Sequence, residues 1–121
     1  MNVIKRNDKN ILLIERHHKI KSAQDLLDHI TDAMYYNKCT GVIVHQNSLS
    51  QEFFDLKSGM AGEILQKCST YGIKIAIIGE FEKFTSKSLK AFIVESNNGN
   101  GVFFKNDMQQ GLEAISNPAH P

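Results

Sequence analysis

Polar side chains that could bind a ligand follow two apolar runs of this chain. His45, Gln46 and Ser48 come after the run VIV, and Glu80 comes directly after the run GIKIAIIG. Ligands gather at the carboxyl ends of the strands in open parallel α/β sheets, so these residues, together with Glu95, form a candidate small-molecule site. His45 could also serve as a base for Ser48, but the Gly-x-Ser-x-Gly sequence that exposes a serine nucleophile is not present.

A second group of residues surrounds the expected start of a helix. Asp55 and Ser58 come before Gly59 and Gly62, and Glu63 follows them. A serine at a helix N-terminus holds its oxygen beside free backbone amides, and glycines allow another molecule to approach closely. These five residues form a candidate interaction surface, with Ser58 as a candidate phosphosite. A plain helix cap at Ser58 and a solvated face at Glu63 are the simpler interpretations.

The sequence shows no combination of residues that indicates catalysis or a metal site. Cys39 and Cys68 form no CxxC pair and are expected to be reduced thiols. His17 and His18 are adjacent on an expected strand end, where neighbouring side chains point to opposite faces and cannot share one ion. We therefore assign no catalytic residue, metal or cofactor, and we favour a protein that is not an enzyme.

Alternating apolar patterns predict the elements that must position these groups. NVIKRN and ILLIER are expected to form a hairpin around the turn Asp8-Lys9-Asn10. VIV, GIKIAIIG and GVFFKN are expected to form three further strands. Four helices are expected beside them, with caps at Ser22, at Ser58, at Thr85 or Ser86, and at Asp107.

The order of these elements predicts a single α/β domain over residues 1–116. Right-handed crossovers would make the last three strands parallel to the second. The result is a mixed, mostly parallel sheet with an N-terminal hairpin and four helices. An α/β sandwich with a different strand order remains open. Residues 117–121 are expected to form a flexible C-terminal tail.

The segment 50–68 is expected to fold in two parts. In one continuous helix Lys57 would fall within the stripe of apolar side chains, and a buried unpaired lysine is costly. A regular helix that begins near Ser58 avoids this cost and leaves Lys57 in solvent. The residues expected in the core of this region are Phe54, Ile64, Leu65, Ala76 and Ile78.

The composition argues against several classes of protein. The chain has 121 residues, of which 41% are hydrophobic and 22% charged, and its formal net charge is +1. A dedicated nucleic-acid binder usually carries a basic stripe, and a membrane span needs about 18 apolar residues; the sequence shows neither. The start MNVIKRNDKN lacks the apolar core of a signal peptide. We expect a cytoplasmic protein that binds neither nucleic acid nor membrane.

This chain resembles one bacterial family, domain-of-unknown-function family 4180. The similar stretches are SQEFFDLKSGMAGEILQK, YGIKIAIIGEF, TSKSLKAFIVESNNG and the pair Phe103-Phe104. The resemblance covers most of the chain, from the first helix to the last strand, and it is most specific in FFDLKSGMAGEILQK. No activity is established for that family, so the resemblance implies membership without implying chemistry.

The order of elements is more distantly similar to that of the STAS domains of anti-sigma-factor antagonists. In those domains an Asp-Ser-Ser-Gly-like motif at the start of a helix carries a phosphorylated serine. Here Asp55-Leu56-Lys57-Ser58-Gly59 stands at the corresponding place, with one extra residue between the aspartate and the Ser-Gly pair. The resemblance implies a STAS-like fold and a regulatory role, although similarity of fold alone does not establish function.

Two functional hypotheses follow. The first is a STAS-like regulatory module without enzymatic activity, which uses the surface around Ser58 to bind a protein partner or to form a homodimer. The second is a small-molecule-binding protein or minor enzyme with its site at the strand ends. A flat face lined by glycine would favour the first hypothesis. A concave site on the order of several hundred cubic ångströms, with convergent polar groups, would favour the second.

Overall fold

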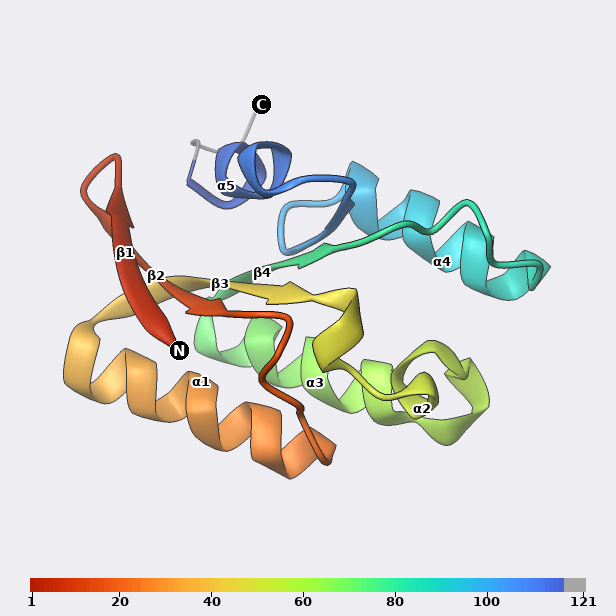
Figure 1. Ribbon diagram of the computed structural model, residues 1–121, viewed down its shortest axis with the longest axis horizontal. Helices are drawn as coiled ribbons and strands as arrows, with labels where there is room; N and C mark the ends of the chain where they lie inside the picture. Colours follow the sequence, from red (N-terminus) through yellow and green to blue (C-terminus); the bar gives the residue numbers. More distant parts are fainter. Residues whose placement is uncertain (117–121) are drawn as a thin grey trace.

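Five strands form one sheet, in which they lie in the same order as in the sequence (Figure 1). The computed structural model describes residues 1–116, so the tail expected at 117–121 lies outside the described residues. The strands are β1 (Asn2–Arg6), β2 (Lys9–Ile14), β3 (Cys39–His45), β4 (Lys74–Ile78) and β5 (Val102–Lys105). The helices are α1 (Ala23–Asn37), α2 (Gln51–Phe54), α3 (Met60–Tyr71), α4 (Lys87–Asn98) and α5 (Met108–Ser116).

The sheet is mixed and mostly parallel, as the sequence predicts. β1 and β2 form an antiparallel hairpin, and the strands from β2 to β5 pair in parallel. The three crossovers all step in one direction across the sheet, and right-handed connections therefore place α1, α3 and α4 over one face. α5 follows the last strand and packs on the opposite face, against β3, β4 and β5 (Figure 1). The four predicted helices are confirmed, and the four-residue α2 is an additional one.

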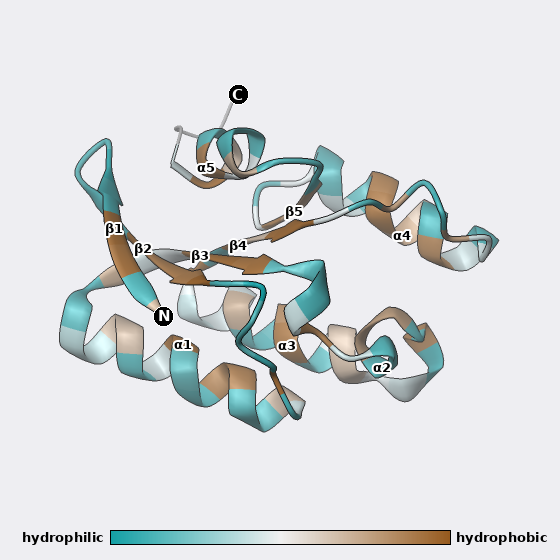
Figure 2. Ribbon diagram, viewed as in Figure 1, coloured by the Kyte–Doolittle hydropathy of each residue, from teal (hydrophilic) through white to brown (hydrophobic). Residues whose placement is uncertain are grey.

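Alternation along the strands divides the core between the two faces of the sheet, because successive side chains of a strand point to opposite faces. The larger cluster, which includes residues of α1 and α3, takes its strand side chains from Leu12, Ile14, Val42, Val44, Ile75 and Ile77. The smaller cluster packs against α5 and contains Ile11, Ile43, Ala76, Ile78, Phe103 and Ile115. Figure 2 shows the apolar residues concentrated along the strands, with polar residues on the outer sides of the helices.

Polar side chains cap three helices where the sequence predicts caps. The hydroxyls of Ser22 and Ser86 accept first-turn N–H groups at 3.0 and 3.2 Å, and the Asp107 carboxylate accepts one at 2.8 Å. The hairpin turn differs from the prediction. It consists of Asn7 and Asp8, with φ of 51° and 63°, because Lys9 and Asn10 already pair with β1. Asn and Asp tolerate this left-handed conformation, which two-residue hairpin turns require.

The connection from β3 to α3 folds in two parts, as predicted. α2 ends at Phe54, a 3₁₀ turn covers Leu56–Ser58, and Lys57 is exposed. The predicted cap was wrong by one residue. The N-cap of α3 is Gly59, whose φ of +79° favours glycine, and Ser58 lies just before it. Ser58 still holds the two parts together. Its Oγ accepts from the Met60 N–H at the start of α3 at 3.1 Å and donates to the Glu52 carbonyl in α2 at 2.7 Å.

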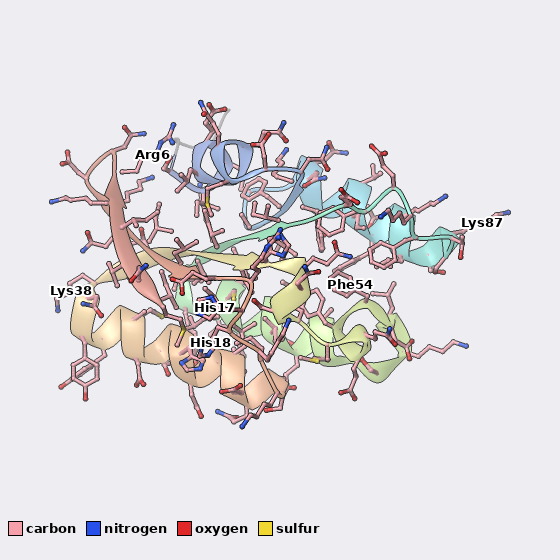
Figure 3. All side chains as sticks on the ribbon, viewed as in Figure 1. Arg6, His17, His18, Lys38, Phe54 and Lys87 are labelled. Atoms are coloured by element: carbon pink, nitrogen blue, oxygen red, sulfur yellow. The ribbon has the colours of Figure 1, made fainter. Side chains whose placement is uncertain are left out.

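Three of the five residues predicted for the core of this region are buried, namely Ile64, Ala76 and Ile78. The prediction was wrong for Phe54 and Leu65, which are half-buried. Leu65 lies at the margin of the buried stripe of α3, whose centre is Ile64. Phe54 ends the short α2 beside the loop that precedes α4, so part of its ring faces a groove (Figure 3).

Candidate functional site

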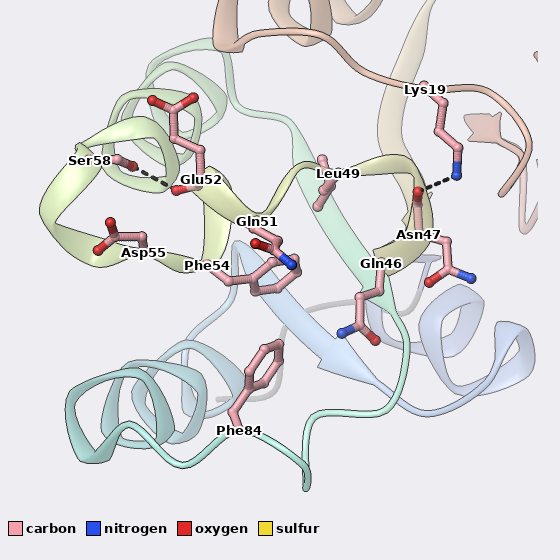
Figure 4. Close-up of a pocket in the computed structure, with 10 residues that line it drawn as sticks. All are labelled: Lys19, Gln46, Asn47, Leu49, Gln51, Glu52, Phe54, Asp55, Ser58 and Phe84. Carbon is pink, nitrogen blue, oxygen red and sulfur yellow. Dashed lines mark hydrogen bonds between the residues drawn. The ribbon is translucent and has the colours of Figure 1, made fainter.

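A pocket and a groove adjoin at the carboxyl edge of the sheet. The pocket has a volume of about 450 Å³, and the chain after each of the four parallel strands contributes to its lining: Arg16, His45, Gln46, Asn47, Gly79, Glu80, Lys83, Phe84 and Asn106. The groove has a volume of about 840 Å³ and extends toward α2 (Figure 4). It is lined by Lys19, Gln46, Asn47, Leu49, Gln51, Glu52, Phe54, Asp55, Ser58 and Phe84. The two hollows therefore share Gln46, Asn47 and Phe84.

The topology explains why a hollow forms at this edge. In open α/β sheets ligands bind outside the carboxyl ends of strands, where neighbouring connections leave toward opposite faces. The chain after β4 leads to α4 on one face, whereas the chain after β5 leads to α5 on the other. Gly79 and Glu80 come from the first of these connections and Asn106 from the second, and all three line the pocket.

Close packing at Gly79 fixes the shared wall of the two hollows. Gln46 belongs to the 3₁₀ turn that follows β3, and its Oε1 accepts from the Glu80 N–H at 2.9 Å. A Cβ added at Gly79 would stand 2.5 Å from the Cβ of Gln46, which is too close for any side chain larger than hydrogen. Gly79 therefore allows this turn to cross the end of β4.

His45 ends β3 with both ring nitrogens facing N–H donors. Its Nδ1 accepts from the Asn47 N–H at 3.1 Å, and Nη2 of Arg16 lies 2.8 Å from its Nε2. A neutral imidazole has one N–H and one acceptor nitrogen, so it can accept only one of these two hydrogen bonds. Burial, and then the positive charges of Arg16 and Lys19, lower the pKa of His45 below its ordinary value. The ring is therefore neutral at pH 7, between two donors.

Positive charge predominates in the lining of the pocket, which contains Arg16 and Lys83 and one carboxylate. The groove has no such excess, because Lys19, whose Nζ donates to the Asn47 carbonyl at 2.7 Å, lines it together with Glu52 and Asp55 (Figure 4). Glu80 is the acidic lining residue, and its carboxylate lies 3.0 Å from the Lys83 ammonium. Both of these side chains are largely exposed, so their ion pair is weak. Within residues 1–116, Arg16 forms no ion pair with a carboxylate.

An aromatic pair forms one side of the groove. The rings of Phe54 and Phe84 stack with their centroids 5.1 Å apart and their planes inclined by 25°. Both side chains are half-buried, and Figure 4 shows the two rings facing each other beside Gln51. Half-buried aromatic rings next to polar groups are typical of sites that bind the apolar part of a small molecule.

The structure brings His45, Gln46 and Glu80 together at the pocket, but it does not bring Ser48 or Glu95 there. Ser48 is buried, and its hydroxyl donates to the Glu15 carbonyl at 2.8 Å, so it joins two loops and does not pair with His45. Glu95 is exposed on α4, outside the lining of both hollows. Neither position could be inferred from the sequence, because each depends on how a loop or helix turns after its strand.

The residues of the candidate interaction surface lie around the start of α3. Ser58, Gly59 and Glu63 line a cleft of about 460 Å³ between the first turns of α1 and α3, while Asp55 lines the groove. Gly62 is exposed, and a Cβ added there would meet no heavy atom of the described chain within 4 Å. The Ser58 hydroxyl is engaged by the Glu52 carbonyl and the Met60 N–H, and these contacts favour a structural role for this serine.

Sequence reasoning named three of the nine residues that line the pocket, and it did not assign the other six to the site: Arg16, Asn47, Gly79, Lys83, Phe84 and Asn106. The rule that identified His45 would also have found Arg16 and Asn106, because both lie within two residues of the end of a strand, β2 for Arg16 and β5 for Asn106. The positions of Lys83 and Phe84 carry no such signal. They depend on the path of the loop between β4 and α4.

Other groups of ionisable residues are placed as follows. In the part of the chain that the structure describes, no set of three or more His, Cys, Asp or Glu side chains could hold a metal ion. His17 and His18 lie in the loop after β2, where the ring of His18 packs edge-on against that of His29 at 5.2 Å (Figure 3). Cys39 and Cys68 are buried free thiols, and burial raises the pKa of Cys68 to about 11.

No helix within residues 1–116 is long and apolar enough to cross a membrane.

Comparison with known proteins identifies the family. The family model described as "Domain of unknown function (DUF4180)" matches residues 6–115, which is most of the chain. No curated protein and no solved structure shows a significant match. The resemblance to this family is therefore confirmed, whereas the resemblance to STAS domains stays a prediction.

Proposed function

Since this chain belongs to the DUF4180 family, whose description names no activity, we propose from its geometry that it is a small-molecule-binding protein. The ligand occupies the pocket and the adjoining groove at the carboxyl edge of the sheet. His45, Gln46 and Glu80 belong to the pocket, and Phe54 and Phe84 provide the apolar side of the groove.

The observation that supports this proposal most is the concavity itself. Small-molecule sites typically measure roughly 300–1,000 Å³ and combine apolar walls with a few convergent polar groups. The pocket and the groove fall within that range and meet at Gln46, Asn47 and Phe84. Since the Ser48 hydroxyl is engaged away from His45, the geometry supports binding, and we assign no reaction to the site.

The test is to identify small molecules that leave the protein when it is unfolded. The protein is purified from the cells that naturally make it and is then denatured, and the released compounds are measured by mass spectrometry. Asn47→Trp fills the junction of the two hollows. It is a suitable variant because Asn47 is exposed and its contacts to His45 and Lys19 use only the backbone. Gln66→Trp, at an exposed position on α3, is the matched control.

We expect wild type and Gln66→Trp to release the same compound and Asn47→Trp to release little of it. Melting curves of the three proteins establish that each is folded. The proposal is contradicted if all three release the same compounds in equal amounts, or if none releases any.

A second candidate function is the contact with a protein partner or a second copy at the surface around Asp55, Ser58, Gly59, Gly62 and Glu63. One observation favours it. A glycine inside a helix costs about 1 kcal/mol relative to alanine. The φ of +79° explains why residue 59 is a glycine. Gly62 has no close contact within the described chain that would require a glycine there. A neighbouring molecule that approaches α3 closely would explain it.

This second candidate is tested by substitution at the surface. Gly62→Arg should block the contact by its bulk, and Ser58→Asp should weaken it by adding charge. Gln110→Arg, at an exposed position on α5, adds the same side chain elsewhere. Pull-downs from the native cells and sedimentation of the pure proteins measure partner binding and self-association. If Gly62→Arg retains the same partners and the same mass as Gln110→Arg, this candidate is wrong.

A further inference from the structure

The contacts of His45 indicate which chemical class of ligand fits the pocket. A neutral ring accepts either from the Asn47 N–H at Nδ1, at 3.1 Å, or from the Arg16 guanidinium at Nε2, at 2.8 Å, but not from both. In either tautomer one of these two donors faces a ring N–H and lacks an acceptor. Within residues 1–116 no carboxylate pairs with Arg16.

We infer that the ligand carries a terminal oxyanion, such as a phosphate, sulfate or carboxylate group, which binds between the Arg16 guanidinium and Nε2 of His45. This inference rests on the proposed function. With the ring proton on Nε2, an oxyanion beside it accepts from both Nε2 and Arg16, and Nδ1 accepts from the Asn47 N–H, so that each of these donors has an acceptor. Arginine is well suited to this task because its planar fork of N–H groups matches the geometry of carboxylates and phosphates.

The surroundings favour an anion whose remainder is apolar and flat. Lys83 lines the same pocket beside its ion-pair partner Glu80, so the charged lining residues Arg16, Lys83 and Glu80 together carry one net positive charge. Phe84 lines both the pocket and the groove, where it stacks on Phe54. A ligand with its oxyanion at Arg16 therefore has an aromatic surface beside it on which a flat apolar part can lie.

The test uses two molecules of nearly the same shape, benzenesulfonate and the neutral benzenesulfonamide. Each is titrated into the full chain, and binding is followed through the backbone amide signals in NMR. We expect benzenesulfonate to shift the signals of Arg16, His45 and Asn47 and to bind at least about tenfold more tightly than the amide, since charge-assisted hydrogen bonds are stronger than neutral ones.

The variants identify the residues that cause this preference. Arg16→Ala should bind the two molecules about equally, because the charged fork is lost. Lys67→Ala removes one positive charge from an exposed position on α3 and should keep the preference of wild type. Glu80→Gln should strengthen binding of benzenesulfonate, because it removes the acidic lining residue.

Two outcomes would overturn the inference. If both molecules bind equally and shift Gln46 and Phe84, the site binds ligands without selecting an anion, and the proposed function remains while the inference fails. If benzenesulfonate binds but shifts only residues outside the pocket, the anion site is elsewhere. The proposed function is decided separately, by the compounds that unfolding releases.

Discussion

At the scale of the residue, His45 shows that the chemistry of a side chain depends on neighbours distant in the sequence. Its place at the end of β3 follows from the apolar run before it. Its pKa is lowered first by burial and then by the positive charges of Arg16 and Lys19, which come from the loop after β2. The sequence could place His45 at the edge of the sheet, but it could not show that the ring lies between two donors.

The first prediction concerns the pH dependence of anion binding at His45. The charged groups near the ring are Arg16, Lys19, Glu80 and Lys83. Burial, and then the positive charges of Arg16 and Lys19, hold the pKa of free His45 below its ordinary value, and the charge of a bound anion opposes those positive charges and raises the pKa. The complex therefore binds a proton more readily than the free protein, so affinity increases as the pH falls.

Benzenesulfonate is the suitable ligand because it stays charged throughout. We expect its affinity to increase as the pH falls from about 8 to about 5.5, by at most about three- to tenfold, which is the limit that a pKa difference of about half to one unit allows. His45→Gln should bind with nearly the same affinity at both pH values. An equally steep pH dependence in wild type and His45→Gln would show that another group takes up the proton.

At the scale of the element, α3 was predictable in its periodicity and less so in its boundaries. The apolar spacing and the unfavourable position of Lys57 indicated a helix that starts near Ser58. The start falls at Met60 because Gly59 adopts the left-handed conformation, which no apolar pattern reveals. The same helix shows why burial is harder to predict than helicity, since Leu65 lies at the margin of the stripe.

The second prediction tests the packing of α3. Ile64 is 0% exposed and lies among the residues of the larger core cluster. Ile64→Ala should lower the free energy of unfolding by about 2–5 kcal/mol, as for other large-to-small changes in a core. Leu65→Ala is the control and should cost less, since Leu65 is half-buried. A loss below about 1 kcal/mol for Ile64→Ala in reversible urea unfolding would mean that the helix presents a different face to the sheet.

The third prediction separates the two glycines at the start of this helix. Gly62→Ala should raise the free energy of unfolding by about 0.5–1 kcal/mol, because alanine is the better helix residue and its Cβ meets empty space. Gly59→Ala should lower it by about 1–2 kcal/mol, because the φ of +79° disfavours a residue with a Cβ. If Gly62→Ala is destabilising, Gly62 serves the folding of this chain, and the reason for a partner surface disappears.

At the scale of the whole molecule, the direction of the chain after each strand determines where a ligand can bind. Element order and right-handed crossovers were sufficient to predict the mixed sheet, because these rules hold for nearly all such connections. The lining of the pocket was predicted only in part. His45, Gln46 and Glu80 follow directly from strand ends, whereas Lys83 and Phe84 depend on the path of a loop. α4 and α5 leave toward opposite faces, and that divergence leaves the hollow at the strand ends.

The most direct test of a ligand site at the carboxyl edge of the sheet is a crystal structure of the protein purified from the cells that naturally make it, without refolding. We predict density for a small molecule bounded by His45, Gln46 and Phe84, with its anionic end against Arg16. A pocket that contains only water, in crystals where a partner or a second copy covers Gly62, would contradict the ligand site and favour the interaction surface.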